Sequence, residues 1–233
     1  MTVHVVFPSA GVGSRFGADI PKQFVKIAGR TIMEWTLLAW QNAPIDGLRI
    51  LVKSKDDAHS NQILKQFDGQ FQSVLGGKER SDSVLNALSY LRKHGKADDW
   101  VMVHDIARPC VSQSDIQALL NACLKNNQGA ILAKPISDTV KQQIAGQVVS
   151  TLDRSTLWSA LTPQCFKLAQ LSDALESALA KGLTITDEAS AIEQAGLPVQ
   201  LIEGSADNIK LTRAEDAELV HFYLKKQKRI SNV

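Results

Sequence analysis

Cysteine is scarce in this sequence, and the three cysteines lie far apart. Cys110, Cys123 and Cys165 form no CxxC pair, and an odd number cannot all pair within one chain. This pattern argues against a secreted disulfide framework and against a zinc ribbon, since both need closely spaced cysteines. The five histidines likewise show no HExxH or other paired metal-ligating spacing. We therefore expect three reduced, mostly buried thiols in a protein of a reducing compartment.

Long apolar runs and an excess of one charge are also missing. No stretch reaches 18 apolar residues, and residues 1–8 lack the basic region of a signal peptide. Lys plus Arg number 26 and Asp plus Glu number 24, so the formal net charge is only +2. That charge is too small to attract nucleic acid or a membrane surface by itself. These features predict a cytoplasmic protein with no nucleic-acid or membrane partner, in which any anion site is built locally.

The composition is that of an ordinary globular protein. With 233 residues, of which 44% are hydrophobic and 21% charged, the chain can bury a sizeable core without disulfides or a structural metal. It contains no internal repeat and no low-complexity linker. The length slightly favours one large domain over two small ones. We therefore expect residues 1–233 to form a single domain.

Short apolar runs alternate with amphipathic stretches along most of the chain. The apolar runs predict buried strands at 3–7, 48–52, 100–104, 129–133 and 199–202. The amphipathic stretches predict helices at 31–42, 57–67, 81–93, 114–125, 168–181, 187–194 and 213–226. Such alternation is typical of an α/β fold with a largely parallel sheet and helices on both faces. Thr212 and Glu215 have capping-box spacing before the last helix, and its basic end at 225–229 is predicted to be solvated.

One segment interrupts this alternation. Residues 138–144 and 147–153 have the character of two strands joined at Ala145-Gly146, which predicts a β-hairpin. A hairpin of two strands is only marginally stable in water by itself. We therefore expect it to pack on the main sheet or on another subunit.

The first predicted strand leads directly into a glycine-rich loop, residues 8–17. Small residues let a ligand approach the backbone, whose amides can receive phosphate oxygens. The loop does not match a dinucleotide fingerprint, because Phe16 stands where the last glycine is required, and no Walker sequence GxxxxGK[ST] is present. Arg15 inside the loop and Lys22 shortly after it add two cations. We infer a nucleoside triphosphate site here rather than a plain strand–helix turn.

Two further clusters carry charge beside predicted elements. At 76–83, two glycines, a basic pair and hydroxyls at a helix start suit a contact with a base or a phosphate, although an ordinary loop and helix cap would look the same. At 100–109, a buried strand leads into Asp105 and Arg108. Open α/β folds bind ligands at the carboxyl edge of the sheet, and one carboxylate with phosphate oxygens and water is typical of Mg²⁺ binding. The alternative for this pair is a surface ion pair.

Seven short motifs occur in one order along the chain. They are AGxGxR with PKQ, GGxxRxDSV, HDxARP, DTxK, DR followed by LTPQ, TDEAS, and ADNIKxT. In these motifs the sequence resembles the 2-C-methyl-D-erythritol 4-phosphate cytidylyltransferase family over essentially its whole length. The resemblance implies a Rossmann-like nucleotidyltransferase fold with a mixed, mostly parallel sheet, dependence on Mg²⁺, and a homodimer joined through a protruding β-arm. The hairpin, at about 137–155, matches that arm, whereas Ile106 departs from the Ala that is common in the family.

The resemblance also implies a reaction and its residues. CTP and 2-C-methyl-D-erythritol 4-phosphate would give 4-CDP-2-C-methyl-D-erythritol and pyrophosphate, in the non-mevalonate isoprenoid pathway. Catalytic roles carry over to Arg15, Lys22, Arg154 and Lys210. Nucleotide-binding roles carry over to Pro8, Ser9, Ala10, Gly11, Val12, Gly13, Gly77, Arg80, Ser83 and Asp105, the last also supporting the metal. Substrate-binding roles carry over to Ile106, Arg108, Thr139, Arg154, Thr162, Thr186 and Lys210. Because Arg154 stands at the exit of the arm, we expect it to act in the neighbouring subunit's site.

Three other functions compete with this one. A ribitol 5-phosphate cytidylyltransferase would share the fold and the use of CTP, but the DTxK and TDEAS motifs favour methylerythritol. A non-catalytic CTP-binding regulator would be expected to lack Arg15 or Lys22, and both are present. An NAD-linked oxidoreductase is disfavoured by Phe16 and by the lack of an acidic residue at the end of a second strand.

Overall fold

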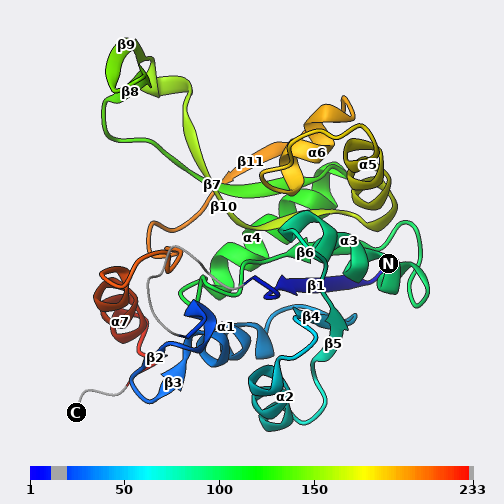
Figure 1. Ribbon diagram of the computed structural model, residues 1–233. Helices are drawn as coiled ribbons and strands as arrows, with labels where there is room; N and C mark the ends of the chain where they lie inside the picture. The colour runs from blue at the N-terminus through cyan, green and yellow to red at the C-terminus, as the bar shows by residue number, and fades with distance from the viewer. Residues whose placement is uncertain (12–19, 231–233) are drawn as a thin grey trace.

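Seven strands form one sheet at the centre of the computed structural model, which describes residues 1–11 and 20–230 (Figure 1). They are β1 (Val3–Pro8), β4 (Arg49–Lys53), β5 (Gln72–Leu75), β6 (Trp100–Val103), β7 (Ala130–Pro135), β10 (Trp158–Lys167) and β11 (Gln200–Glu203). Their order across the sheet is β11-β7-β10-β6-β1-β4-β5. Within this sheet β10 runs antiparallel to β6 and β7, and the other neighbouring pairs are parallel. The predicted mixed, mostly parallel sheet is confirmed.

Helices cover both faces of this sheet, as predicted. One face is covered by α1 (Ile32–Gln41), α2 (Ala58–Leu64) with the 3-10 turn η2 (Lys65–Phe67), and α4 (Gln113–Asn126). The other is covered by α3 (Arg80–Arg92), α5 (Leu168–Ala180) and α6 (Glu188–Gln194). Successive strand residues point to opposite faces, so Val5 and Phe7 join the first core and Val6 the second. Burial on both sides explains the uninterrupted apolar run of β1.

Two strands of the main sheet were not expected from the sequence. β5 lies at the sheet edge and exposes most of its side chains, so it lacks the apolar run of a buried strand. β10 pairs Ala160 with Ala133 and Gln164 with Ile131, so that three of its residues bulge where β7 has one. The bulge includes Pro163, which has no N–H to offer a sheet ladder. The middle of β10 contains polar residues and a proline instead of a continuous apolar run, so the sequence did not predict this strand.

A smaller unit packs beside the main sheet. It consists of α7 (Asp216–Lys226) and the ribbon of β2 (Lys26–Ile27) and β3 (Arg30–Thr31), which share a third core with α1. The Asp216 carboxylate accepts hydrogen bonds from the backbone N–H groups of Thr212 and Arg213, so the expected capping box of Thr212 with Glu215 is not formed. Arg229 lies in the tail expected to be solvated, but it donates to backbone carbonyls of α1 and of the loop after β6.

The predicted hairpin forms a separate arm. β8 (Val140–Ile144) and β9 (Gln147–Leu152) are inserted between the antiparallel neighbours β7 and β10, and they project from the body of the molecule (Figure 1). Ala145 and Gly146 have φ values of 50° and 80°, the positive pair that a two-residue type I′ turn requires. Ile144 and Val148 are 65% and 63% exposed. Within one chain the arm therefore leaves apolar side chains in water.

Two expectations about composition can be compared with the fold. All three cysteines are free and buried, as predicted. Among the helices that the structure describes, none combines the length and the apolar character needed to cross a membrane.

Candidate active site

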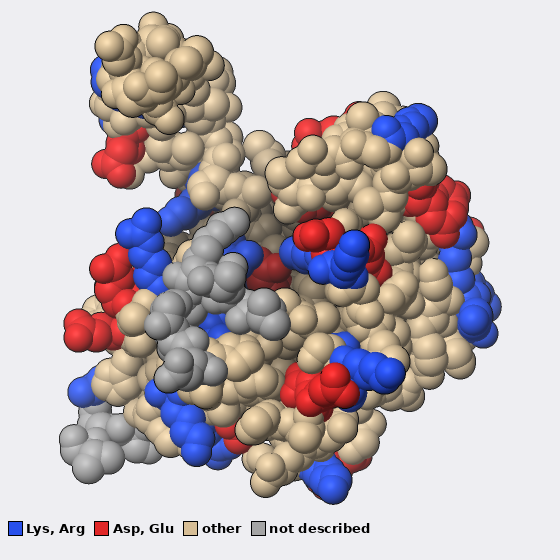
Figure 2. Space-filling model, viewed as in Figure 1, with Lys and Arg blue, Asp and Glu red and all other residues tan. Residues whose placement is uncertain are grey.

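The carboxyl ends of β1 and β6 meet at one edge of the sheet, where the order of the strands reverses. The chain adds β4 and β5 on one side of β1 and then places β6 on the other side. Loops diverge at such a point and leave a crevice, which is where open α/β sheets bind ligands. Figure 2 shows a hollow in this face of the molecule, with basic and acidic side chains mixed around it.

A cavity of about 480 Å³ lies at this edge of the sheet. The site residues predicted from the sequence that line it are Pro8, Ser9, Ala10, Gly11, Lys22, Gly77, Arg80, Ser83, Asp105, Ile106 and Lys210. It is also lined by Gln23, Lys78, Glu79, Ala107 and Thr212, which were not among the individual site residues predicted from the sequence. Val12, Gly13 and Arg15 lie outside the residues that the structure describes. Four motifs separated in the sequence thus surround one space.

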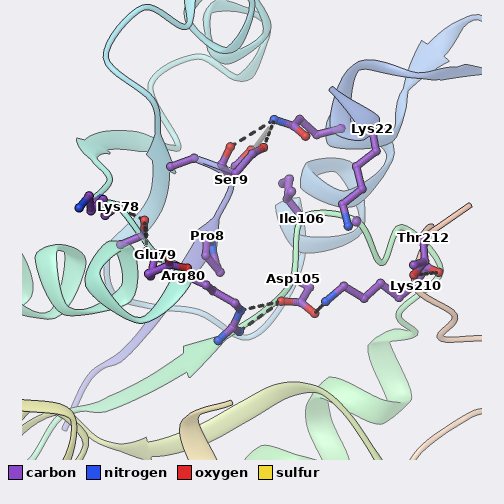
Figure 3. Close-up of a pocket in the computed structure, with 16 residues that line it drawn as sticks. Pro8, Ser9, Lys22, Lys78, Glu79, Arg80, Asp105, Ile106, Lys210 and Thr212 are labelled. Carbon is purple, nitrogen blue, oxygen red and sulfur yellow. Dashed lines mark hydrogen bonds and ion pairs between the residues drawn. The ribbon is translucent and has the colours of Figure 1, made fainter. Parts of the chain in front are cut away.

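Gln23 holds the start of the glycine-rich loop against this cavity. Its buried side-chain amide donates hydrogen bonds to the carbonyl oxygens of Ser9 at 3.2 Å and Gly11 at 3.3 Å. The Ser9 hydroxyl is buried and has no hydrogen-bond partner among the described residues. Lys22 extends into the same cavity from the 3-10 turn η1 (Lys22–Phe24) (Figure 3).

The loop before α3 passes close to Ala10, which follows β1, and to Asp82 of α3, because it begins with two glycines. A Cβ on Gly76 would lie 2.4 Å from the Cβ of Ala10, and one on Gly77 would lie 2.3 Å from the Cβ of Asp82. The Ser83 hydroxyl accepts a hydrogen bond from the Gly77 N–H at 3.1 Å and donates one to the Glu79 carbonyl at 3.0 Å. Ser83 therefore shapes the loop whose backbone lines the cavity.

Asp105 lies among three cations at the inner end of the cavity. Its Oδ1 accepts a hydrogen bond from Arg80 Nε at 3.2 Å, and its Oδ2 lies 2.8 Å from Lys210 Nζ and 3.6 Å from Arg108 Nε. Arg80 and Lys210 approach the carboxylate from opposite sides (Figure 3). Burial by itself raises the pKa of Asp105, but Arg80, Lys210 and Arg108 outweigh burial and hold that pKa well below its usual range. Asp105 is therefore a permanent anion at neutral pH.

Glu188 holds Arg80 from its other end. The buried Glu188 carboxylate accepts hydrogen bonds from Arg80 Nη1 at 2.6 Å and from Nη2 at 3.1 Å. Burial lowers the pKa of Arg80, but Glu188 and Asp105 outweigh burial and raise it. Glu188 opens α6, where the helix dipole favours a negative charge. Its TDEAS motif was visible in the sequence, but a helix start alone does not indicate a partner more than one hundred residues away.

A second cavity of about 280 Å³ adjoins the first and shares Arg80, Asp105 and Lys210 with it. Three more of the predicted site residues line it, namely Arg108, Thr162 and Thr186. Ala160, Leu161, Gln164 and Asp187 complete its lining. Ligands bound in the two cavities would meet beside Asp105. This arrangement suits a reaction between two bound molecules.

Two buried side-chain amides fix the wall of this second cavity. Gln164 donates to Asp187 Oδ2 at 2.8 Å and accepts from the Ala189 N–H at 2.8 Å, which ties the bulge of β10 to α6. The Asn208 side-chain amide donates to the Thr162 carbonyl at 2.7 Å, and the Asn208 backbone carbonyl accepts from Arg108 Nη1 at 2.7 Å. The sequence contained both amides within its motifs but did not indicate which backbone groups they would satisfy.

Some predicted residues lie apart from where the sequence grouped them. Thr139 and Arg154 line neither cavity; both are exposed, and Arg154 donates to the Ser137 carbonyl at the base of the arm. Ile106 lines the first cavity rather than the second, and its side chain is buried. A single chain therefore does not bring Arg154 to Lys210.

Comparison with known proteins agrees with this geometry. The model of the 2-C-methyl-D-erythritol 4-phosphate cytidylyltransferase family matches residues 3–226. The protein of that name from Vibrio vulnificus (strain YJ016) is 46% identical over 224 residues, covering 96% of this chain and 94% of its own. The crystal structure of the Francisella tularensis 2-C-methyl-D-erythritol 4-phosphate cytidylyltransferase superposes with a TM-score of 0.84 at 36% identity, covering 96% of this chain and 100% of that chain. The chain therefore belongs to the 2-C-methyl-D-erythritol 4-phosphate cytidylyltransferase family.

Proposed function

We propose that this protein transfers the cytidylyl group of CTP to 2-C-methyl-D-erythritol 4-phosphate, giving 4-CDP-2-C-methyl-D-erythritol and pyrophosphate in the non-mevalonate isoprenoid pathway. Besides the family, one observation carries the proposal: two adjoining cavities share Arg80, Asp105 and Lys210. CTP would occupy the larger cavity and the polyol phosphate the smaller one. The substrate phosphate would then lie beside the α-phosphate of the nucleotide.

The chemistry requires alignment and charge neutralisation rather than a nucleophilic side chain. An oxygen of the substrate phosphate attacks the α-phosphorus in line, and pyrophosphate leaves. That oxygen is already ionised at neutral pH, so no general base is needed. Both reactants are anions, and the protein must offset their repulsion while it holds them in reach of each other.

Three cations are arranged for this task. Lys22 lines the nucleotide cavity, Arg108 the substrate cavity and Lys210 both. Asp105 pairs with Lys210 and Arg108 when substrate is absent. An incoming phosphate, which carries more charge than a carboxylate, would compete with Asp105 for these two cations. Asp105 thus keeps the two cations in position beside the substrate cavity.

Asp105 also fits the needs of a divalent cation. It is ionised and lines both cavities, and no group of three or more acidic, histidine or cysteine side chains able to hold a metal occurs within residues 1–11 and 20–230. Mg²⁺ commonly uses one carboxylate together with phosphate oxygens and waters. We propose that Asp105 supports Mg²⁺ alongside the triphosphate. When bound, the metal would offset charge on the departing pyrophosphate.

We propose that the arm joins two copies of the chain as a homodimer. Its apolar residues Ile144 and Val148 are more than half exposed, and Lys141 is the sole charged residue of β8 and β9. Figure 2 shows the arm as a mostly uncharged projection. Thr139 and Arg154 stand at its base, away from both cavities of their own chain. In a dimer, Arg154 and Thr139 would complete the substrate cavity of the neighbouring subunit.

We also propose that the protein works in the cytoplasm. Cys110, Cys123 and Cys165 are all free and buried, and such thiols are typical of a reducing compartment.

Product analysis tests the activity directly. Purified protein is incubated with Mg²⁺, CTP and either 2-C-methyl-D-erythritol 4-phosphate or ribitol 5-phosphate, and a parallel arm replaces CTP by UTP. We expect pyrophosphate and the CDP-polyol from CTP with the methylerythritol substrate, and at least a hundredfold lower efficiency in the other arms. UTP is expected to react poorly because cytosine presents a donor amine where uracil presents an acceptor. Equal use of ribitol 5-phosphate would contradict the substrate, and equal use of UTP would contradict the nucleotide.

A further inference from the structure

His104 is buried behind Asp105, which lines both cavities, and the proposed chemistry gives His104 no task. It follows β6, immediately before Asp105, and is fully buried. Its ring packs against Trp40 and Phe7, with centroids 5.2 Å and 6.3 Å away. Each ring nitrogen nevertheless has a polar partner: Nε2 lies 3.0 Å from the Arg108 carbonyl oxygen, and Nδ1 lies 3.1 Å from the Thr162 hydroxyl.

The donors and acceptors around His104 determine where each hydrogen lies. The Arg108 carbonyl can only accept, so Nε2 must carry a hydrogen. The ring is fully buried and neither of its nitrogens faces a carboxylate, so it is neutral and Nδ1 is left as an acceptor. The Thr162 hydroxyl oxygen accepts from the Asp105 N–H at 3.1 Å and has its own hydrogen to donate. That hydrogen goes to Nδ1, and every group in the chain of hydrogen bonds is satisfied.

This chain of hydrogen bonds joins three parts of the substrate cavity. Thr162 lies in the bulge of β10, whereas Asp105 and Arg108 lie in the loop after β6, where the Arg108 N–H donates to the Asp105 carbonyl at 3.0 Å. Because the Thr162 hydrogen is already committed to His104, Thr162 can offer a ligand only a lone pair. A lone pair suits a hydroxyl group of the substrate, which can donate, and does not suit a phosphate oxygen, which can only accept.

We propose that His104 is a positioning residue for the polyol phosphate: it fixes the loop that carries Arg108, and it makes Thr162 an acceptor for a substrate hydroxyl. This role rests on the proposed function, because it assigns the second cavity to a hydroxylated substrate. No contact between His104 and either substrate is required.

Two substitutions at His104 separate its two hydrogen bonds. His104→Gln retains a donor for the Arg108 carbonyl and loses the acceptor for Thr162, whereas His104→Asn retains an acceptor near Nδ1 and loses the donor. An unsatisfied buried polar group disturbs its neighbours strongly. We expect either variant to raise the KM for the polyol phosphate about tenfold, while the KM for CTP changes less than twofold.

Changes at Thr162 test the same link from its other side. Thr162→Ser keeps the hydroxyl and is expected to retain a KM near that of the wild type, whereas Thr162→Val removes the hydroxyl and should match His104→Gln. Since Thr162→Val already breaks the link, adding His104→Gln should raise the KM no further. If the two increases simply multiply, the proposed link is wrong.

His4 provides a matched control. It is also buried, and its partners are the Leu48 N–H, which donates to Nδ1 at 2.9 Å, and the Asp99 carboxylate, but neither partner lines a cavity, whereas both partners of His104 do. His4→Gln should lower the melting temperature without changing either KM. If the His104 variants behave in the same way, with lower stability and an unchanged KM for the polyol phosphate, His104 is only a structural residue.

Nitrogen NMR of the histidine-labelled protein provides a readout that needs no substrate. We expect the His104 ring to carry a hydrogen on Nε2 alone at pH 7, and its Nδ1 resonance to shift in Thr162→Val. A hydrogen on Nδ1 would overturn the proposal. If the wild type forms no CDP-polyol, the proposed function fails, and the spectrum still decides the hydrogen-bond pattern even where a His104 variant does not fold.

Discussion

At the scale of single residues, Lys22 is expected to contribute to ligand binding much more than to the stability of the fold. It sits in a short 3-10 turn and lines the nucleotide cavity. We predict that Lys22→Ala lowers turnover roughly a hundredfold or more, the usual cost of removing a positioned charge from a transferring phosphate. Steady-state kinetics and the melting temperature measure the two effects, and Lys26→Ala, an exposed lysine four residues away, is the control. Unchanged turnover and CTP affinity in Lys22→Ala would mean that the triphosphate lies elsewhere.

The three cysteines carry a second prediction at this scale. Burial raises the pKa of Cys110 to about 12 and raises that of Cys165 well above its ordinary value. The thiolate is the reactive form of cysteine, so the native protein at pH 8 should give almost no colour with Ellman's reagent within minutes. After denaturation, all three thiols should react. Rapid reaction of one thiol in the native protein would contradict their burial.

At the scale of elements, the hairpin arm differs from the strands of the seven-stranded sheet. Its strands pair with each other, and its apolar side chains gain nothing from burial within one chain. By contrast, β1 is buried on both faces and contributes to two cores at once. An element of this kind is best explained by a partner that covers it.

The double substitution Ile144→Ser with Val148→Ser tests that explanation. Both side chains are more than 60% exposed in one chain, so the melting temperature of the body should change little. Loss of two buried apolar contacts should weaken dimerisation roughly a hundredfold, as measured by sedimentation velocity over a range of concentrations. Phe222→Ser, which removes an exposed apolar side chain of α7, should leave the association unchanged. A wild-type protein that is monomeric at micromolar concentration would contradict the arm's role.

At the scale of the whole molecule, the active site is expected to be shared between subunits. Lys210 belongs to the chain whose cavities it lines, whereas Arg154 belongs to the base of the arm. In a symmetric dimer, each arm would serve the opposite subunit. The substrate cavity of an isolated chain would then lack one of its cations.

A mixed dimer of Arg154→Ala and Lys210→Ala chains tests this sharing. Each variant alone should lose about a hundredfold or more in turnover, since each removes a charge from a phosphate contact. If Arg154 acts in the partner's site, the mixed dimer contains one intact site and one doubly damaged site. Each mixed dimer should then have up to half of the activity of a wild-type dimer. If both residues serve their own chain, every site remains damaged and mixing restores nothing.

Local sequence patterns were sufficient to predict much of the fold and part of the candidate site. Burial on two faces produces uninterrupted apolar runs, and burial on one face of a helix produces an amphipathic period, so the alternating α/β order and the exposed hairpin could be predicted. The glycine-rich loop, the 76–83 cluster and Asp105 could also be identified, because each follows a recognisable strand or precedes a helix. Such features depend on neighbours a few residues away.

Only the tertiary structure decided which side chains meet. β5 and the bulged β10 escaped prediction because an edge strand and an irregular strand have no regular apolar pattern. Glu188 holds Arg80 across more than one hundred residues, and Thr162 reaches His104 across 58. These contacts depend on the order of strands in the sheet and on donors and acceptors that must be satisfied once buried. The sequence specifies which hydrogen-bond donors and acceptors are present, and their burial in the folded chain determines which of them must pair with one another.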